Sequence, residues 1–221
     1  MKKLELIIFD MDGVLIDTEK FYMKSEYQII KSFGKEVELD YFSRFCGTTQ
    51  DNIWGNLKKD FDLPQSLEEL KVIAKKQLLH LFETEKVELI PNIAESLAEL
   101  KSAGYTLAVA SSTEKPIIQS HLDNLNLSQY FDYIKSGEEV EHSKPAPDVF
   151  LAVAKDLNIP TENAIVIEDS TNGIQAAKNA EMLCVAYNNP AYHAVDQTKA
   201  DVIISDMTYL TSELLENLFD K

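Results

Sequence analysis

The sequence predicts an α/β protein, in which a doubly wound, Rossmann-like parallel sheet forms the core and a small all-helical domain is inserted after the first strand. Three observations favour this class. A short apolar run at Leu4–Phe9 is typical of a buried parallel strand. From Thr18 to about Glu85 the apolar residues recur with a helical period. After Pro91 short apolar runs alternate with helical segments, which implies βαβ units.

The helical block contains clear helix signals. Apolar residues between Phe21 and Phe33 recur at helical spacing, and Gly34 ends that helix. Ser66-Leu67-Glu68-Glu69 is a capping-box pattern, which predicts a second helix that reaches about Phe82. The block therefore has the local signals of a helical domain.

Beyond Pro91 the elements alternate. Strands are expected at Tyr105–Ala110, Tyr133–Ser136, Ala164–Ile167, Met182–Tyr187 and Asp201–Ile204. Helices are expected at Asn92–Ala103, about Glu114–Leu125, Pro147–Leu157 and around Gly173–Ala180. Gly104 follows the first of these helices, as expected for a helix C-terminus.

Because the helical block interrupts the strands, we expect residues 17–90 to form an inserted helical cap, and residues 1–16 and 91–221 to form the catalytic core. The block carries a net charge of −3, and the rest of the chain carries −13 of the total of −16. Half of the basic groups thus lie in a third of the chain, which would suit a lid over an anionic ligand. Amphipathic helices with lysines on solvated faces explain the same distribution.

The composition excludes several classes of function. With 37 acidic and 21 basic residues, the chain would be repelled by nucleic acid. Neither G-x-G-x-x-G nor G-x-x-x-x-G-K-[ST] occurs, so the dinucleotide fingerprint and the P-loop are absent. No apolar run approaches the ~18 residues of a membrane span. Cys46 and Cys184 show no metal-ligand spacing, which favours two reduced thiols in a cytoplasmic protein.

Two acidic motifs follow predicted strands. Asp10-Met11-Asp12-Gly13-Val14 comes directly after the first strand, where ligands bind in open α/β sheets. Its two carboxylates would repel each other unless a cation or a proton lies between them, whereas an N-cap or Asx-turn would explain only one of them. Glu168-Asp169-Ser170 follows the apolar strand Ile165–Ile167. Two such pairs on neighbouring strands would form a hard-oxygen pocket for Mg²⁺, and the lack of interleaved His or Cys argues against zinc.

Two further motifs suit an anion. Ser111-Ser112-Thr113 follows the strand that begins at Tyr105 and offers hydroxyls and backbone N–H groups at a helix start, a phosphate seat whose alternative is ordinary helix capping. Lys144 lies between Ser143 and Pro145, before a second proline. Proline restricts the local backbone, which makes this an unusual place for a solvated lysine.

Together these four pieces resemble the motifs of the haloacid dehalogenase superfamily of phosphotransferases in order, strand-end placement and spacing. The matching segments are D-x-D-G-V at 10–14, the strand that ends at Ser111, K-P-x-P-D at 144–148 and E-D-S-x-x-G-I-x-A-A at 168–177. The helical insertion resembles the cap of the β-phosphoglucomutase-like branch. The resemblance implies a mobile cap that closes over the core and excludes bulk water.

The resemblance also implies roles for the acidic residues. Asp10 would be the nucleophile that attacks a phosphate monoester and forms an aspartyl-phosphate. Asp12 would act as general acid for the leaving alkoxide and then as general base for water. The dehalogenases replace this second Asp and need no metal, so Asp12 argues against dehalogenation.

The phosphate and metal sites follow from the same resemblance. Ser111 and Lys144, with the backbone N–H groups of Met11, Asp12 and Ser112, would hold the phosphoryl oxygens.

Mg²⁺ would lie between the phosphate and a set of protein oxygens. These ligands are the carboxylates of Asp10 and Asp169, the backbone carbonyl of Asp12 and, as a further candidate, Glu168. The metal and Lys144 would together offset the repulsion between a carboxylate and a phosphate dianion.

The cap positions favour hydrolysis over mutase chemistry. Sugar-phosphate mutases of this branch carry His, Arg and Lys where this chain has Tyr22, Gln50 and Gln77. We therefore expect a cytoplasmic, monomeric phosphatase that acts on a small phosphorylated metabolite, with no nucleic-acid or membrane partner. The alternatives are a sugar-phosphate mutase and, in another class, a non-catalytic phospho-acceptor domain. Arg44, the one arginine, could reach the site or form an ordinary ion pair.

Overall fold

The computed structural model describes residues 3–45, 48–192 and 195–220 of the 221-residue chain. Cys46 lies outside the described residues, and Cys184 is a buried free thiol. Among the described helices, none is long and apolar enough to cross a membrane.

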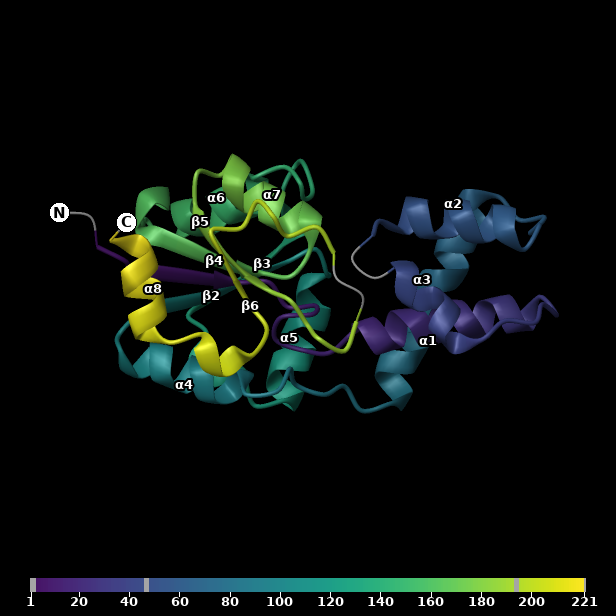
Figure 1. Ribbon diagram of the computed structural model, residues 1–221, viewed down its shortest axis with the longest axis horizontal. Coiled ribbons are helices and arrows are strands. Elements are labelled where there is room, and N and C mark those ends of the chain that lie inside the picture. The colour runs from purple at the N-terminus through teal and green to yellow at the C-terminus, as the bar shows by residue number, and fades with distance from the viewer. Residues whose placement is uncertain (1–2, 46–47, 193–194, 221) are drawn as a thin grey trace. The chain divides into compact units, whose positions relative to one another are not determined.

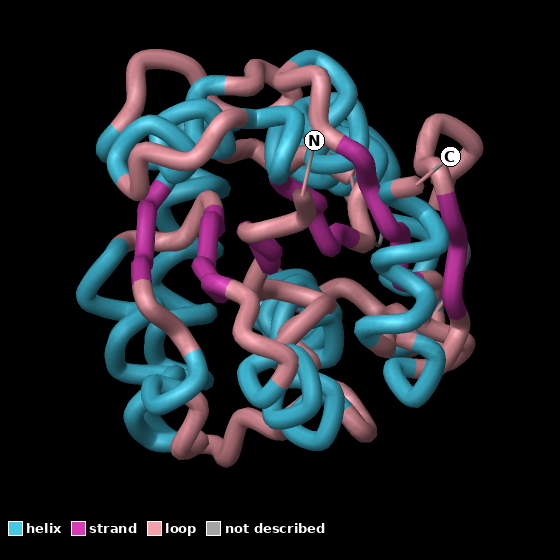
Figure 2. Tube along the Cα trace, turned by 90° about the vertical axis from the view of Figure 1, so that its left-hand side faces the viewer, coloured by secondary structure: helices cyan, strands magenta, loops and turns pink. Residues whose placement is uncertain are grey.

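Six parallel strands form one sheet in the order β3-β2-β1-β4-β5-β6. The strands are β1 (Leu6–Phe9), β2 (Thr106–Ser111), β3 (Tyr133–Ser136), β4 (Ala164–Glu168), β5 (Leu183–Tyr187) and β6 (Val202–Ile204). Helices cover both faces: Figure 1 shows α6 and α7 on one face and α4, α5 and α8 on the other, and Figure 2 shows the strands between helices. The predicted α/β class with a doubly wound parallel sheet is confirmed.

The helices of this part are α4 (Ile93–Ser102), α5 (Lys115–Asn124), α6 (Asp148–Asp156), α7 (Thr171–Asn179) and α8 (Ser212–Phe219). The sequence analysis does not predict α8. Strands β2 and β4 each extend one residue beyond the expected ends, because Ser111 pairs with Ser136 and Glu168 pairs with Ala186 in the ladder. Two predicted site residues are therefore the last residues of strands, held by the sheet itself.

The chain divides into two compact units. The first, called the core unit, comprises residues 1–17, 88–190 and 194–221, and the second, called the cap unit, comprises residues 18–87 and 191–193.

In the core unit the central strand is buried on both faces, since all four residues of β1 are inaccessible to solvent. Leu6 and Ile8 belong to one cluster with Val149, Phe150 and Val153 of α6. Such two-sided burial is expected of a parallel strand covered by helices, and it makes the end of β1 a rigid place for a polar side chain.

The cap unit packs α1 (Glu19–Ser32), α2 (Gln50–Asp60) and α3 (Leu67–Thr84) with a 3₁₀ helix at Leu39–Phe45. Both hydrogen bonds of the capping box at Ser66 are present, so the predicted start of α3 is confirmed. The fully buried Trp54 donates its indole N–H to Gln50 Oε1 at 3.0 Å.

Two cap side chains named in the sequence reading bond within the cap unit itself. Arg44 forms an ion pair with Asp60 at 2.5 Å and stacks on the ring of Tyr41, which is the ordinary-ion-pair alternative. Gln77 donates its amide to Gln28 Oε1 at 2.6 Å.

Candidate active site

The candidate site lies where β1, β2 and β4 end side by side. Phe9, the last residue of β1, pairs with Val109 and Ile167, so β1 and β4 are neighbours, as the acidic motifs required. Asp10 follows at once, and its N–H donates to the carbonyl of Ile167 at 2.9 Å. The parallel register thus brings Asp10, Ser111 and Glu168 to the same edge of the sheet.

Lys144 supplies the positive charge at the centre of this edge. Its Nζ donates to Asp10 Oδ1 at 2.5 Å, to Glu168 Oε1 at 2.8 Å and to the carbonyl oxygen of Ala110 at 3.1 Å. The Lys144 side chain is only 7% exposed, and its ammonium lies 4.9 Å from the centre of the Phe150 ring. Lys144 is therefore not a solvated lysine, because three protein acceptors replace the water around its ammonium.

The groups around Lys144 shift its pKa and that of Asp10. Burial alone would lower the pKa of Lys144, but the carboxylates of Asp10 and Glu168 outweigh it and hold that pKa above its usual range. Burial raises the pKa of Asp10, with Glu168 and Asp12 adding to the rise and Lys144 opposing it. The site therefore sets the carboxyl groups of Asp10, Asp12 and Glu168 against one lysine.

Glu168 is fully engaged at the start of α7. While Oε1 accepts from Lys144, Oε2 accepts from the N–H groups of Asp169 and Ser170, both at 2.9 Å, and from the Ser170 hydroxyl at 3.0 Å. Ser170 is also the N-cap of α7 and accepts from the N–H of Gly173 at 3.0 Å. A carboxylate at a helix N-terminus is further stabilised by the helix dipole.

Asp12 is held by two hydroxyl groups from the end of β2. Its Oδ2 accepts from Ser111 Oγ at 3.2 Å and from Thr113 Oγ1 at 2.9 Å. The N–H of Thr113 donates to Ser111 Oγ at 3.1 Å, which orients that hydroxyl, while Ser136 donates to the carbonyl of Thr113 at 2.7 Å. The Ser111–Thr113 segment therefore does not cap α5, whose N-cap is Glu114.

Asp169 lies against the backbone of the first motif. A Cβ built on Gly13 would fall 2.1 Å from Asp169 Oδ2, so this carboxylate occupies the space that any larger residue would need. Gly13 also has a φ of +79°, which favours glycine. The backbone of Asp169 is held in turn, because the buried Gln197 amide donates to its carbonyl at 2.6 Å and to that of Tyr187 at 2.9 Å.

Three backbone donors remain available at this edge. Over the described part of the chain, the N–H groups of Met11, Asp12 and Ser112 donate to no protein acceptor. These are the groups that the resemblance assigned to phosphate, and they come from the segments that follow β1 and β2.

Direct hydrogen bonds thus join the predicted side chains in two groups at the same edge of the sheet, Lys144 with Asp10 and Glu168, and Asp12 with Ser111. The sequence does not predict the contribution of Gln197, because a glutamine whose amide is buried carries no signal in a single sequence. Thr113 and Gly173 lie inside predicted motifs, which assign neither of them an individual role.

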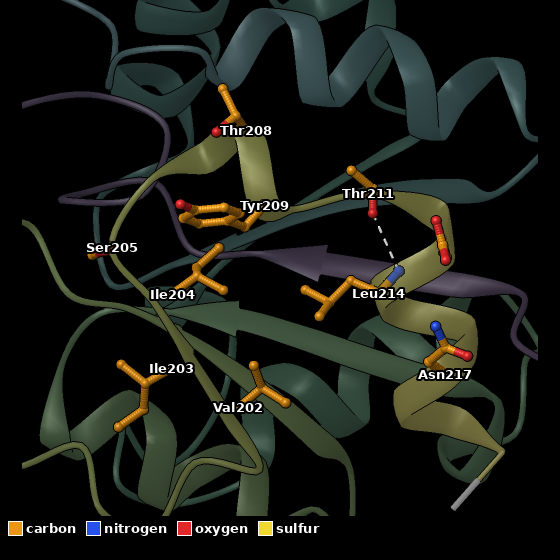
Figure 3. A pocket seen from close by; sticks show the side chains of 10 residues that line it. Val202, Ile203, Ile204, Ser205, Thr208, Tyr209, Thr211, Leu214 and Asn217 are labelled. Atoms are coloured by element: carbon orange, nitrogen blue, oxygen red, sulfur yellow. Dashed lines mark hydrogen bonds between the residues drawn. The ribbon is translucent and has the colours of Figure 1, made fainter.

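The described residues hold no ready-made cage of three Asp, Glu, His or Cys side chains for a metal ion. A groove of about 510 Å³ lies beside the edge strand β6, where Figure 3 shows Ile203, Tyr209 and Leu214 around it. Its lining residues all fall within 202–217, so it includes none of the predicted site residues.

Comparisons with known proteins match most of the chain. The family model described as haloacid dehalogenase-like hydrolase matches residues 7–187. The chain is 34% identical over 177 residues to a phosphorylated carbohydrates phosphatase of Thermotoga maritima, covering 80% of this chain and 82% of that protein. It is 29% identical over 213 residues to hexitol phosphatase B of Escherichia coli, covering 93% and 94%.

A solved structure of a β-phosphoglucomutase from Clostridium difficile has the same fold. It superposes with a TM-score of 0.76 at 22% identity, covering 98% of this chain and 97% of that one.

Proposed function

Because the chain belongs to the haloacid dehalogenase-like hydrolases, we propose that it is a Mg²⁺-dependent phosphatase that hydrolyses a small phosphorylated metabolite, a sugar phosphate or a similar monoester. The observation that carries the proposal is the contact between Asp10 and Lys144 at the end of β1. A carboxylate can attack a phosphate dianion only where positive charge offsets their repulsion, and this buried ammonium supplies part of it.

The chain's own groups account for the two half-reactions. Asp10 attacks phosphorus, the bond to the alcohol breaks, and Asp12 donates a proton to the leaving oxygen. Water then attacks the phosphorus of the resulting aspartyl-phosphate and gives a proton to Asp12. The bond between phosphorus and the Asp10 oxygen breaks, which frees the Asp10 carboxylate and inorganic phosphate. Lys144, the Ser111 hydroxyl and the backbone N–H groups of Met11, Asp12 and Ser112 hold the phosphoryl oxygens in both steps.

The residues at this edge fit Mg²⁺. Mg²⁺ is usually held by one or two carboxylates with waters and substrate phosphate, so a three-side-chain cage is not required. The carboxylates of Asp10 and Asp169 and the carbonyl of Asp12 would hold it, with Glu168 beside them, and the several carboxyl groups set against one lysine favour such a cation. When bound, Mg²⁺ supplies the positive charge that Lys144 alone does not provide.

The mutase alternative has one observation in its favour, the shared fold with a β-phosphoglucomutase. Against it stand Tyr22, Gln50 and Gln77, at positions where the resemblance places the mutase's His, Arg and Lys. Gln50 and Gln77 already bond to Trp54 and Gln28 inside the cap unit. Hydrolysis is therefore the proposed reaction, and we expect it in a cytoplasmic monomer that needs no nucleic-acid or membrane partner.

The test is a hydrolysis screen over sugar phosphates, polyol phosphates and a generic aryl phosphate, with and without Mg²⁺. We expect Mg²⁺-dependent release of phosphate that Asp10→Asn reduces by at least about 10³-fold, because the amide is a poor nucleophile. Asp220→Asn, at an exposed position after α8, serves as the control and should change nothing. Unchanged hydrolysis in Asp10→Asn would refute the nucleophile. Interconversion of two sugar phosphates with little phosphate release would favour the mutase.

A further inference from the structure

Gly173 lies in the first turn of α7, where its backbone conformation does not require glycine. The glycines with positive φ in the described chain are Gly13, Gly34 and Gly104, and Gly173 is not among them. Its N–H makes the N-cap bond to Ser170, which any non-proline residue would make. Glycine normally weakens a helix, so its presence in α7 needs another reason.

The reason is space. A Cβ built on Gly173 would lie 1.6 Å from Glu168 Oε1, 1.9 Å from Cδ and 2.4 Å from Oε2, far inside any real contact distance. Gly55, in the middle of α2, has nothing within 4 Å of the same position. The Glu168 carboxylate therefore occupies the volume that a side chain at residue 173 would fill.

The Glu168 side chain cannot move away from residue 173 without losing hydrogen bonds. It is 1% exposed, and its two oxygens accept four hydrogen bonds, from Lys144, from two backbone N–H groups and from the Ser170 hydroxyl. Its backbone is paired with Ala186 in the sheet. A rotation away from residue 173 would break these bonds and leave buried polar groups unpaired.

Lys144 would be affected next. Its ammonium lies between Glu168 and Asp10, so loss of the Glu168 contact removes one of the two carboxylates that hold it. Because Lys144 approaches Asp10 at 2.5 Å, a shift of the ammonium changes the charge beside the proposed nucleophile.

We propose that Gly173 is a positioning residue, which leaves room for the Glu168 carboxylate and thereby sets the position of the Lys144 ammonium against Asp10. This inference rests on the proposed function, because it concerns the same phosphate-transferring site. It assigns a role to a residue that touches neither substrate nor metal, and it predicts that the effect of Gly173 passes through Glu168.

The experiment is a size-complementation cycle with Gly173→Ala, Glu168→Asp and the double variant. Glu168→Asp withdraws the carboxylate by one methylene and so makes room for the new methyl group. We expect Gly173→Ala to lower kcat on an aryl phosphate at saturating Mg²⁺ by at least tenfold. The double variant should be at least as active as Gly173→Ala alone, although Glu168→Asp alone loses activity. Gly55→Ala is the matched control, with wild-type kcat and slightly higher helix stability.

A second readout does not use the reaction. Urea unfolding of the same four proteins, followed by far-ultraviolet circular dichroism, should show that Glu168→Asp lessens the destabilisation caused by Gly173→Ala by at least tenfold in the unfolding equilibrium constant. If Gly173→Ala is recovered only unfolded, a folded double variant supports the proposal and an unfolded one overturns it.

The outcomes separate the two proposals. Wild-type kcat in Gly173→Ala, or losses in the double variant that equal the product of the single losses, would overturn the role of Gly173. Absence of hydrolysis by the wild-type protein would overturn the proposed function, and the unfolding cycle would then decide whether Gly173 and Glu168 are coupled. An additive unfolding cycle overturns the inference in either case.

Discussion

The core unit and the cap unit each bury a carboxyl group, and they treat it in opposite ways. Asp10 of the core unit faces the Lys144 ammonium at 2.5 Å, and Lys144 donates two further hydrogen bonds, to Glu168 and to the carbonyl of Ala110. Glu26 of the cap unit is 3% exposed, and its carboxyl makes no hydrogen bond or ion pair with the residues that the structure describes. Burial raises the pKa of Glu26 to about 8, and the neighbouring Glu19 adds to the rise.

The two carboxyl groups differ in whether a cation lies beside them. A buried charge costs several kcal/mol unless partners replace its water. The core unit lowers that cost for Asp10 with the Lys144 ammonium, which favours the charged form of this carboxyl. The cap unit offers Glu26 no such partner among the described residues, so this carboxyl is neutral near pH 7 and lowers stability wherever it ionises.

The largest effect is expected from removing the cation of the core unit. Lys144→Met leaves Asp10 and Glu168 facing each other without a positive charge, so hydrolysis should fall by about 10³-fold. The free energy of unfolding should drop by about 3 kcal/mol, since two buried carboxyls lose their partner. Phosphate release measures the loss of hydrolysis, and urea unfolding measures the loss of stability.

The control for Lys144 comes from the cap unit. Lys24 is 39% exposed and pairs with Glu85 at 2.6 Å, nearly the same separation in a solvated place. Lys24→Met should change the free energy of unfolding by less than about 1 kcal/mol. Equal losses in Lys144→Met and Lys24→Met would contradict the view that burial, rather than distance, sets the strength of these pairs.

The next largest effect concerns the buried carboxyl of Glu26 in the cap unit. The pKa of Glu26 is higher in the folded protein than its ordinary value of 4.5, so the folded state binds more protons between pH 4.5 and about 8. The free energy of unfolding therefore falls as the pH rises through this window, and the full cost is present above it. Glu26→Gln cannot ionise, so relative to the wild type it should gain stability as the pH rises from 4.5 to 9, by about 5 kcal/mol for a pKa rise of this size.

Trp54 makes this effect measurable in the cap unit alone. It is the single tryptophan of the chain and is fully buried in the cap unit, so its fluorescence in urea follows the unfolding of that unit. Glu36→Gln, at a side chain that is 91% exposed, should leave the pH dependence unchanged. A Glu26→Gln protein that loses stability with pH in parallel with the wild type would show that Glu26 is not the group responsible.

Much of the fold followed from the sequence because the signals are local. Apolar runs of buried strands, the capping box at Ser66 and glycines after helices each depend on neighbouring residues, and the structure confirms them. The sequence does not predict the short helix α8, because its apolar residues span less than two turns, at Leu214, Leu215, Leu218 and Phe219. So short a segment gives too little periodicity to recognise.

The part of the site at the strand ends was predictable from backbone position. Asp10 and Glu168 end neighbouring strands, so the order of elements already implied that they meet. Thr113 and Gln197 reach their partners by side-chain direction, which no spacing in the sequence reveals. Gly173 acts through space that exists only once the helix α7 lies beside Glu168.

The smallest effect is expected at Thr113, where the core unit holds a carboxylate with hydroxyl groups instead of a cation. Asp12 Oδ2 accepts from two hydroxyl groups, those of Ser111 and of Thr113, the latter at 2.9 Å. Thr113→Val removes the second donor and keeps the shape of the side chain at residue 113. If Asp12 is the general acid, kcat should fall by about tenfold for an alkyl phosphate, whose leaving group needs the proton. For an aryl phosphate, whose leaving group is stable as an anion, the fall should be smaller. Thr113→Ser keeps the donor and should retain activity on both esters. Equal losses of kcat on the two esters would indicate a general disturbance of the segment after β2. Thr113 would then stabilise that segment and would not position Asp12 as the acid.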